Sequence, residues 1–144
     1  MKREELGWRP FFQHQLTEDD RDLTPARVRR QDVDRYHLMA ESGDLVAILP
    51  GRNRLKSSSR ADLPAVGDWV LVSGDSEDIC TIERTLERMS KFSRKEAGDR
   101  LDEQVLAANI DTVFIVGGLD ANFNPNRIER FLVVAANSGA LPVV

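Results

Sequence analysis

The sequence has too few of the residues that make disulfides, zinc sites or membrane spans. Its single cysteine, Cys80, cannot form an internal disulfide, and no Cys or His stands beside it at metal-ligand spacing. We therefore expect Cys80 to be a small strand residue. No apolar run approaches the ~20 residues that span a bilayer. The basic N-terminus precedes no apolar core of a secretory signal, so we predict a cytoplasmic protein without membrane contact.

Histidine is almost as scarce, and neither histidine has a partner for catalysis. His14 and His37 stand beside no nucleophile and no second carboxylate at useful spacing, so we expect both to be structural or surface residues. We predict no catalytic residue, no cofactor-binding residue and no metal ligand in this chain.

The sequence does contain an uneven distribution of charge. The net charge of -4 argues against a generally basic surface. Residues 24–60, however, hold eight Arg or Lys against four acidic residues, whereas residues 61–88 hold two against seven. Such polarity can turn one face toward a polyanion while the other face repels it. The alternative is an ordinary solvated surface with chance clustering.

Short strand patterns separated by turns fill residues 24–88. They make five strands, and a long, basic, polar loop over residues 52–68 separates the third strand from the fourth. Five short strands with the longest connection in this place predict an OB-type Greek-key barrel. A small SH3-like barrel fits the pattern almost as well.

The character of the sequence changes near Met89. Residues 89–110 are charge-balanced, show no strand pattern and end in a short helical stretch, so we predict a linker with a short helix. The following residues spell strand, helix and strand. Residues 112–116 in the first strand are β-branched and aromatic without alternation, so we expect this strand to be buried on both faces, as in a parallel sheet covered by helices. Asn124 is the expected N-cap, Pro125 the first helical residue and Gly139 the stop.

These patterns predict a mainly β chain of four parts. They are an N-terminal extension (1–23), the barrel (24–88), the linker (89–110) and the incomplete first βαβ unit of an α/β domain (111–144). Two parallel strands and one helix leave most of their apolar faces uncovered. We therefore expect a chain cut short at Val144, by a cloning boundary or a shortened reading frame, and an adventitious dimer through the unfinished sheet.

Several stretches resemble one bacterial family in order along the whole chain. They read LGWRPFF, LPAVGDWV, FSRKEAG, EQVLAANIDTVFIV and LDANFNPNRIERFL, at residues 6–12, 63–70, 92–98, 103–116 and 119–132. Together they are similar to the small-subunit-dependent ribosomal GTPase A family, RsgA or YjeQ. The resemblance implies an N-terminal OB barrel that binds rRNA, then a circularly permuted P-loop GTPase domain, then a zinc-binding domain.

The resemblance also implies a function for the whole protein, which would hydrolyse GTP to GDP in late maturation of the small ribosomal subunit. Its implied cofactors are GTP, magnesium and a structural zinc, and its implied partner is the small subunit with its rRNA rather than DNA. In this family the guanine-specificity motif comes directly after the strand that begins at residue 141, and the phosphate-binding loop comes later.

The chain itself lacks the residues that GTP hydrolysis needs. It contains no G-x-x-x-x-G-K-[ST] sequence, and Gly117-Gly118 is too sparse to replace one. Hydrolysis requires backbone amides and a lysine around the phosphates, together with magnesium ligands. We therefore predict that this chain alone neither binds nor hydrolyses GTP.

RNA binding by the barrel would depend chiefly on Arg and Lys contacts to phosphates. The candidates lie near the first strand pair, in the long loop and in the linker: Arg29, Arg30, Arg35, Arg52, Arg54, Lys56, Arg60, Lys91, Arg94 and Lys95. For each, a solvated surface charge is the alternative. Tyr36 and His37 are the only candidates for stacking on bases, because Trp69 starts a strand and we expect it in the core.

Glu103, Gln104 and Asn109 match a family-specific stretch, and the resemblance suggests that they fix the linker against the GTPase domain. A stand-alone OB-fold module that binds RNA or protein, without GTPase activity, is the alternative function. The βαβ opening argues against it, because a binding module has no use for half of a nucleotide-binding sheet.

Overall fold

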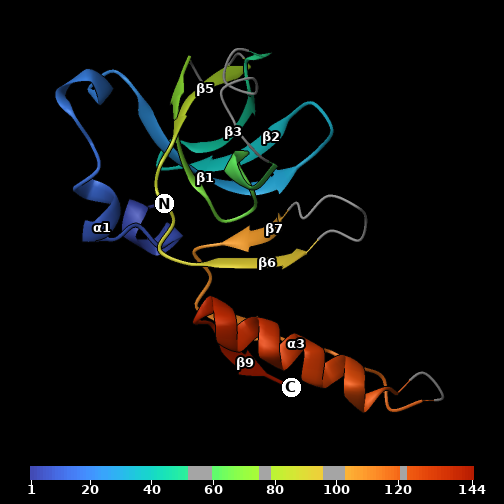
Figure 1. Cartoon of the computed structure of the whole chain (residues 1–144). Coiled ribbons are helices and arrows are strands. Elements are labelled where there is room, and N and C mark those ends of the chain that lie inside the picture. Colours follow the sequence, from blue (N-terminus) through green and yellow to red (C-terminus); the bar gives the residue numbers. More distant parts are fainter. Residues whose placement is uncertain (52–59, 75–78, 96–102, 121–122) are drawn as a thin grey trace.

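The structure, a computed structural model, describes residues 1–51, 60–74, 79–95, 103–120 and 123–144. Figure 1 shows a barrel with the N-terminal segment beside it, a two-stranded hairpin below it, and then a unit of one helix and two strands. The helical elements are η1 (Arg3–Leu6), α1 (Pro10–Gln13), η2 (Glu18–Asp20), η3 (Arg60–Asp62) and α3 (Pro125–Ser138). The strands are β1 (Thr24–Gln31), β2 (Tyr36–Ala40), β3 (Gly43–Ile48), β4 (Trp69–Ser73), β5 (Cys80–Thr85), β6 (Lys91–Lys95), β7 (Glu103–Ala108), β8 (Thr112–Phe114) and β9 (Leu141–Val143).

The barrel closes in the order β1-β2-β3-β5-β4, with β4 pairing back to β1. Every pairing in the barrel is antiparallel except that of β3 with β5, which is parallel. Because β4 and β5 exchange places relative to chain order, the barrel is a Greek key and not a simple meander. The OB-type prediction is confirmed, including the long connection between the third and fourth strands.

The barrel interior is lined by alternate residues of its strands, as the pleat of a β-strand requires. Strand β2 shows this most clearly, because Tyr36, Leu38 and Ala40 are buried while the residues between them are only partly covered. Cys80 is fully buried among these side chains, which confirms its prediction as a small strand residue.

The N-terminal segment covers the outside of β4. Leu6, Trp8 and Phe12 pack against Trp69 and other outward residues of the barrel in a second hydrophobic cluster. The rings of Trp8 and Trp69 meet edge to face with centroids 4.7 Å apart, a favourable geometry for aromatic pairs. The predicted core position of Trp69 is confirmed, since its exposed fraction is 0%.

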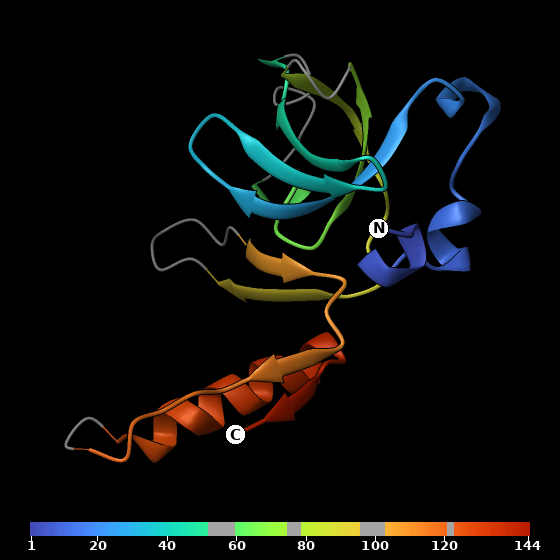
Figure 2. The ribbon, with the colours of Figure 1, turned by 180° about the vertical axis from the view of Figure 1, so that it is seen from behind.

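The prediction of a linker with a short helix over residues 89–110 is wrong. Strands β6 and β7 pair antiparallel as a hairpin, with Lys91 opposite Ala108 and Lys95 opposite Glu103. The hairpin lies between the barrel and α3 in Figures 1 and 2. Residues 103–108 (EQVLAA) have good helix propensity, but cross-strand pairing and packing on two sides outweigh it.

The last part is a βαβ unit, as predicted. Strands β8 and β9 are parallel, and α3 connects them. Asn124 accepts a hydrogen bond from the Arg127 amide, Pro125 begins the helix, and Gly139 ends it with φ +78°. β8 was expected to be buried on both faces, yet Phe114 is 74% exposed, because the helix covers only one side of the two strands.

Candidate nucleic-acid interface

The ten basic candidates fall into two groups. Arg52, Arg54 and Lys56 lie outside the described residues, and of Arg60 and Lys95 the structure describes only the backbone, in η3 and β6. The other five have described side chains: Arg29, Arg30 and Arg35 on β1 and its turn, and Lys91 and Arg94 on β6.

Two of the three barrel arginines already hold carboxylates. Arg29 Nη1 lies 3.0 Å from Asp44 Oδ2, and Arg30 Nε lies 2.8 Å from Asp32 Oδ1. All four side chains are more than a third exposed, so solvent screening makes each pair weak. A phosphate oxygen can therefore replace the carboxylate at small cost. Arg35 is exposed, and no ion pair to a described residue engages its side chain.

The stacking candidates are held by the barrel. Tyr36 is 2% exposed, so its ring presents no face to solvent. His37 Nε2 lies 2.9 Å from Asp32 Oδ2, and the hydrogen bonds from His37 and then Arg30 lower the pKa of Asp32. Residues 24–88 hold only two Phe, Tyr or Trp residues, Tyr36 and the buried Trp69, so the barrel has no exposed ring of these types for base stacking.

The basic residues of β6 pair across the hairpin. Lys91 Nζ lies 2.6 Å from Glu103 Oε2, and Arg94 Nε donates to Gln104 Oε1 at 3.0 Å. The hydrogen bonds from Lys91 and then Ser93 lower the pKa of Glu103. These hydrogen bonds tie β7 to β6, and the expectation that Glu103 and Gln104 fix this segment against the GTPase domain stays a prediction.

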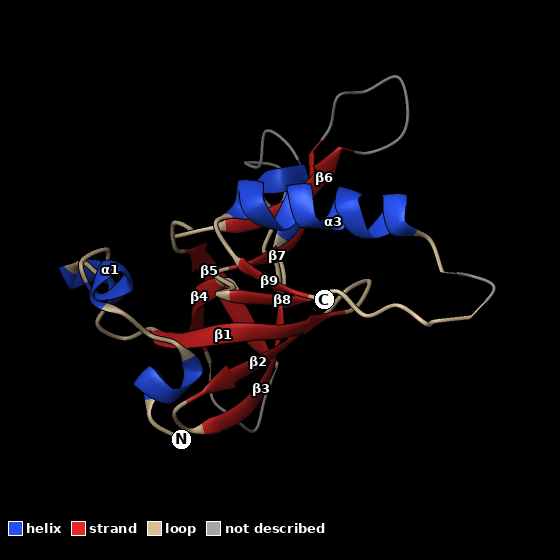
Figure 3. Cartoon of the chain, turned by 90° about the horizontal axis from the view of Figure 1, so that it is seen from below, coloured by secondary structure: helices blue, strands red, loops and turns tan. Residues whose placement is uncertain are grey.

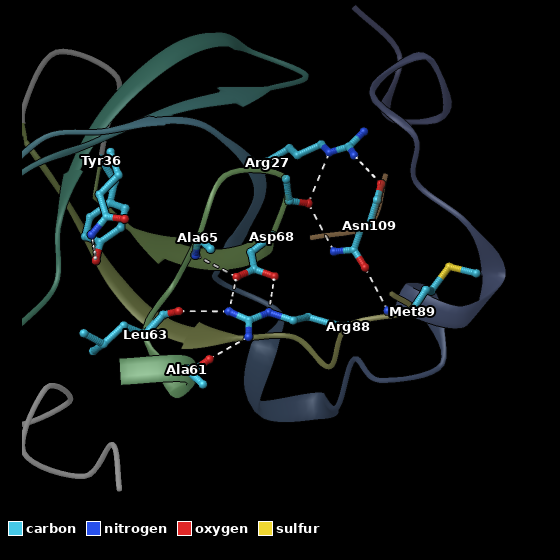
Figure 4. Close-up of polar contacts among 11 residues, drawn as sticks. Arg27, Tyr36, Ala61, Leu63, Ala65, Asp68, Arg88, Met89 and Asn109 are labelled. Atoms are coloured by element: carbon cyan, nitrogen blue, oxygen red, sulfur yellow. Dashed lines mark hydrogen bonds and ion pairs between the residues drawn. The ribbon is translucent and has the colours of Figure 1, made fainter. Parts of the chain in front are cut away.

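A buried ion pair, missed from the sequence, closes the base of the long loop. Arg88 donates from Nε and Nη2 to the two carboxylate oxygens of Asp68 at 2.8 and 2.7 Å, and Asp68 is fully buried. Arg88 also donates to the carbonyls of Ala61 and Leu63, as Figure 4 shows. Burial lowers the pKa of Arg88, but the hydrogen bonds and charge of Asp68 outweigh it and leave the pKa raised.

A second missed arginine joins three segments. Arg27 on β1 donates to the carbonyls of Leu6, Gly67 and Asn109 at 2.5, 3.3 and 2.7 Å. Its burial lowers its pKa, with smaller contributions from nearby charges. In Figure 4 this arginine and Asn109 converge on the same carbonyl.

Asn109 ties both ends of the hairpin to the barrel. Its side chain donates to the Gly67 carbonyl at 3.1 Å and accepts from the Met89 amide at 2.8 Å. It adopts φ +55°, a conformation that asparagine tolerates better than most residues. Asn109 was expected to anchor this segment, but to the GTPase domain, whereas these contacts reach the barrel and the start of the hairpin.

Gly67 allows the hairpin to approach so closely. A Cβ atom at Gly67 would overlap the carbonyl oxygen of Ala108, and the residue has φ +90°. The Ala108 amide in turn donates to the Val66 carbonyl at 2.8 Å. The glycine-aspartate pair in LPAVGDWV was visible in the sequence, but nothing local showed what it would touch, because its partners lie about 20 and 40 residues away.

The described residues contain no cluster of candidate metal ligands. Among residues 1–51, 60–74, 79–95, 103–120 and 123–144, no group of three His, Cys, Asp or Glu could hold a metal ion. None of the described helices has both the length and the apolar character needed to cross a membrane.

Comparison with known proteins identifies one family. A sequence model of the RsgA GTPase matches residues 85–144. The chain is 43% identical, over 141 residues, to the small ribosomal subunit biogenesis GTPase RsgA 2 of Vibrio parahaemolyticus, covering 97% of this chain and 36% of that protein. It is 41% identical to RsgA of Opitutus terrae, covering 96% of this chain and 41% of that protein.

Two solved structures share the fold. The crystal structure of YjeQ from Thermotoga maritima has a TM-score of 0.58 and 20% identity, over 83% of this chain and 39% of that one. YloQ, described as a circularly permuted GTPase, has a TM-score of 0.54 and 17% identity, over 89% and 42%. The chain thus spans about two fifths of the length of the relatives it matches.

Proposed function

Because this chain belongs to the RsgA GTPase family, we propose that it is the rRNA-docking, N-terminal part of a GTPase that acts in maturation of the small ribosomal subunit. The observation that carries the proposal is the continuity of the match. It covers 97% of the chain, through the barrel, the hairpin and the βαβ unit, at 43% identity to a protein named for small-subunit biogenesis. A stand-alone binding module would not require the βαβ unit, so no observation favours that alternative.

The proposed RNA contact is electrostatic and reads the shape of folded RNA. Arg35 is exposed, Arg29 and Arg30 hold only weak surface pairs, and the basic residues of 52–60 follow in the loop. Phosphate contacts of this kind release counterions and make binding strongly dependent on salt. The absence of an exposed Phe, Tyr or Trp in the barrel sequence favours contacts to phosphates and 2′-hydroxyls over stacking on single strands.

We propose that GTP hydrolysis belongs to the whole protein and that this chain alone is inactive. The βαβ unit supplies a helix and two strands of scaffold, whereas no phosphate-binding loop occurs in its sequence. GTP, magnesium and the structural zinc are therefore assigned to parts of the longer relatives that this chain does not match. Saturable binding of a fluorescent GTP analogue to the purified chain would contradict this assignment.

The decisive experiment measures binding of the chain to small-subunit rRNA and to purified small subunits over a range of salt concentrations. Arg52→Glu/Arg54→Glu/Lys56→Glu should weaken binding at least about tenfold and make the plot of log affinity against log salt less steep. The matched control, Lys2→Glu/Arg21→Glu/Arg130→Glu, changes the net charge equally at exposed sites before η1, after η2 and on α3. Equal losses in both variants would show that net charge alone drives binding and would overturn this surface.

The remaining expectations rest on the same proposal. Small-subunit maturation, the process for which the relatives are named, takes place in the bacterial cytoplasm, which is where we place the protein.

We also propose that the isolated chain dimerises weakly through its βαβ unit, where Phe114, Val116 and Leu141 are exposed. A monomer at high concentration in sedimentation equilibrium would contradict the dimer.

A further inference from the structure

One guanidinium group lies where the barrel, the N-terminal segment and the hairpin meet. The three carbonyls that Arg27 holds belong to Leu6 before the barrel, Gly67 in the loop before β4, and Asn109 after β7. The guanidinium is a rigid planar fork of five donors, so it fixes the angles between its acceptors as well as their distances. No described carboxylate accepts a hydrogen bond from Arg27, so its donors serve the backbone of these three segments.

The hairpin cannot shift on the barrel while these bonds persist. Asn109 holds Gly67 on the barrel side and Met89 at the start of the hairpin, so both ends of the hairpin are tied to one point. The close approach of Gly67 to Ala108 leaves no room for sliding, because even a methyl group would clash there.

The βαβ unit is attached to the hairpin in turn. Helix α3 packs against β6, and Phe92 on β6 is 8% exposed. Phe92 shares a cavity of about 640 Å³ with Ile128 and Phe131 of α3. In Figure 3, seen from below, α3 runs across the hairpin strands on the side away from the barrel. The hairpin is thus a spacer with the barrel on one side and the helix on the other.

A second, weaker link crosses the same junction. Arg9 Nη2 lies 2.8 Å from Asp111 Oδ1, so the N-terminal segment also contacts the residue before β8. Both residues line a cleft of about 230 Å³, together with Arg27 and Gly139 among others. Both members of this ion pair are well exposed, so it adds little rigidity. The rigid connection is the one through Arg27.

We propose that Arg27 is a positioning residue that fixes the orientation of the hairpin and the βαβ unit relative to the barrel. Whatever holds the barrel then also sets the direction of α3. The use of this geometry rests on the proposed function, in which a barrel docked on the small subunit presents the GTPase part at a set angle. The geometry itself can be tested without RNA.

The test measures amide residual dipolar couplings of the whole 144-residue chain. In the wild type, amides of the barrel and of α3 should fit one alignment tensor. Arg27→Met should give two tensors, with a smaller magnitude for α3, while the chemical shifts of buried barrel residues such as Leu38 and Ile82 stay unchanged. Arg27→Lys keeps the charge but not the fork, and it should behave like Arg27→Met. A merely structural role would move stability without separating the tensors.

The matched control is Arg29→Met, the same change two residues along β1 at an exposed side chain, and it should leave one tensor. One tensor of unchanged magnitude in a folded Arg27→Met chain would overturn the proposal. If Arg27→Met does not fold, Arg27→Lys decides, because it keeps the charge and loses the planar fork that holds the three carbonyls. Separated tensors in a folded Arg27→Lys chain support the proposal, and a single tensor of unchanged magnitude overturns it.

RNA binding by the same samples separates this inference from the proposed function. Arg27→Met should bind small-subunit rRNA with wild-type affinity, because its donors face backbone carbonyls inside the junction. A wild-type chain that binds no rRNA would contradict the proposed function and leave the orientation result standing. Loss of RNA affinity in Arg27→Met with a single tensor retained would make Arg27 a contact residue and overturn the positioning role.

Discussion

The barrel and the βαβ unit are made by one chain but differ in how they bury apolar side chains. In the barrel, both faces of β4 are buried. Val70 and Val72 lie in the barrel core, and Trp69 and Leu71 pack beneath the N-terminal segment. In the βαβ unit, by contrast, most of the apolar residues of the two strands and their loops stay in solvent, with Val116 93% exposed. Each Å² left exposed forgoes about 25 cal/mol of stabilisation. The barrel therefore supplies its own core, whereas the βαβ unit relies on its contact with the hairpin.

The hairpin lies between these two regions. It packs on η3 through β7 and on α3 through β6, so it connects a region with a complete core to one without. Its hydrogen bonds to the barrel involve buried and half-buried groups, whereas its bonds across β6 and β7 are mostly exposed. We expect substitutions to have the largest effects in the barrel and at its junction, and smaller effects farther along the chain.

Trp69→Ala should cause the largest loss of stability. The ring is fully buried against Trp8 and Phe12, so Trp69→Ala opens a large cavity and should lower the free energy of unfolding by about 3–5 kcal/mol. Urea unfolding followed by circular dichroism measures the loss. The matched variant in the other region, Phe114→Ala, removes a 74% exposed ring and should change stability by about 0.5 kcal/mol or less. Equal losses would erase the distinction between the regions.

Breaking the buried ion pair should have a similar or slightly smaller effect. Arg88→Met leaves Asp68 buried without its charge partner, which typically costs about 3–5 kcal/mol. Asp68→Asn/Arg88→Met removes both charges and should recover a large part of that loss. Unfolding of all four members of this double-mutant cycle gives the coupling between the two side chains. Independent, additive losses would mean that the pair is not formed in solution.

The close approach at the junction should rank third. Gly67→Ala places a methyl group against the Ala108 carbonyl at a residue with positive φ, and we expect a loss of about 1–3 kcal/mol with weakened hairpin protection. Gly43→Ala is the matched control, because Gly43 has φ +124° but no atom within 4 Å of the added methyl. The difference between the two variants isolates the contact from the backbone strain. Hydrogen exchange of the Ala108 amide reports the hairpin directly.

The smallest expected effect is a pH dependence of stability that arises from Asp20 in η2, in the N-terminal segment. The backbone hydrogen bond from Thr17, and then the Thr17 hydroxyl and Arg84, lower the pKa of Asp20 below its ordinary 3.8, against the effect of burial. The ionised carboxylate therefore stabilises the fold above pH 3.8, and this contribution is lost as the pH falls through the lower folded-state pKa. Asp20→Asn should make the melting temperature depend less on pH below about pH 4. Asp19→Asn, next along η2, should leave the curve steep.

The sequence was sufficient for features that depend on neighbours along the chain. Alternation predicted the barrel strands, and capping chemistry predicted both ends of α3 at Asn124 and Gly139. The candidate phosphate contacts came from charge alone, and for the described ones the structure adds their partners, such as Asp44 for Arg29. Which of these residues contact RNA stays a prediction.

The tertiary structure decided what distant residues do to one another. Residues 103–108 form a strand despite their helix propensity, because β6 on one side and the barrel on the other supply contacts that a local pattern does not contain. Arg27 and Arg88 look like any surface arginine in the sequence, since the carbonyls and the carboxylate that hold them lie about 20 to 80 residues away. Local chemistry thus predicted the barrel strands and α3, whereas only the folded chain formed the hairpin and placed these two half-buried guanidinium groups at its junction with the barrel.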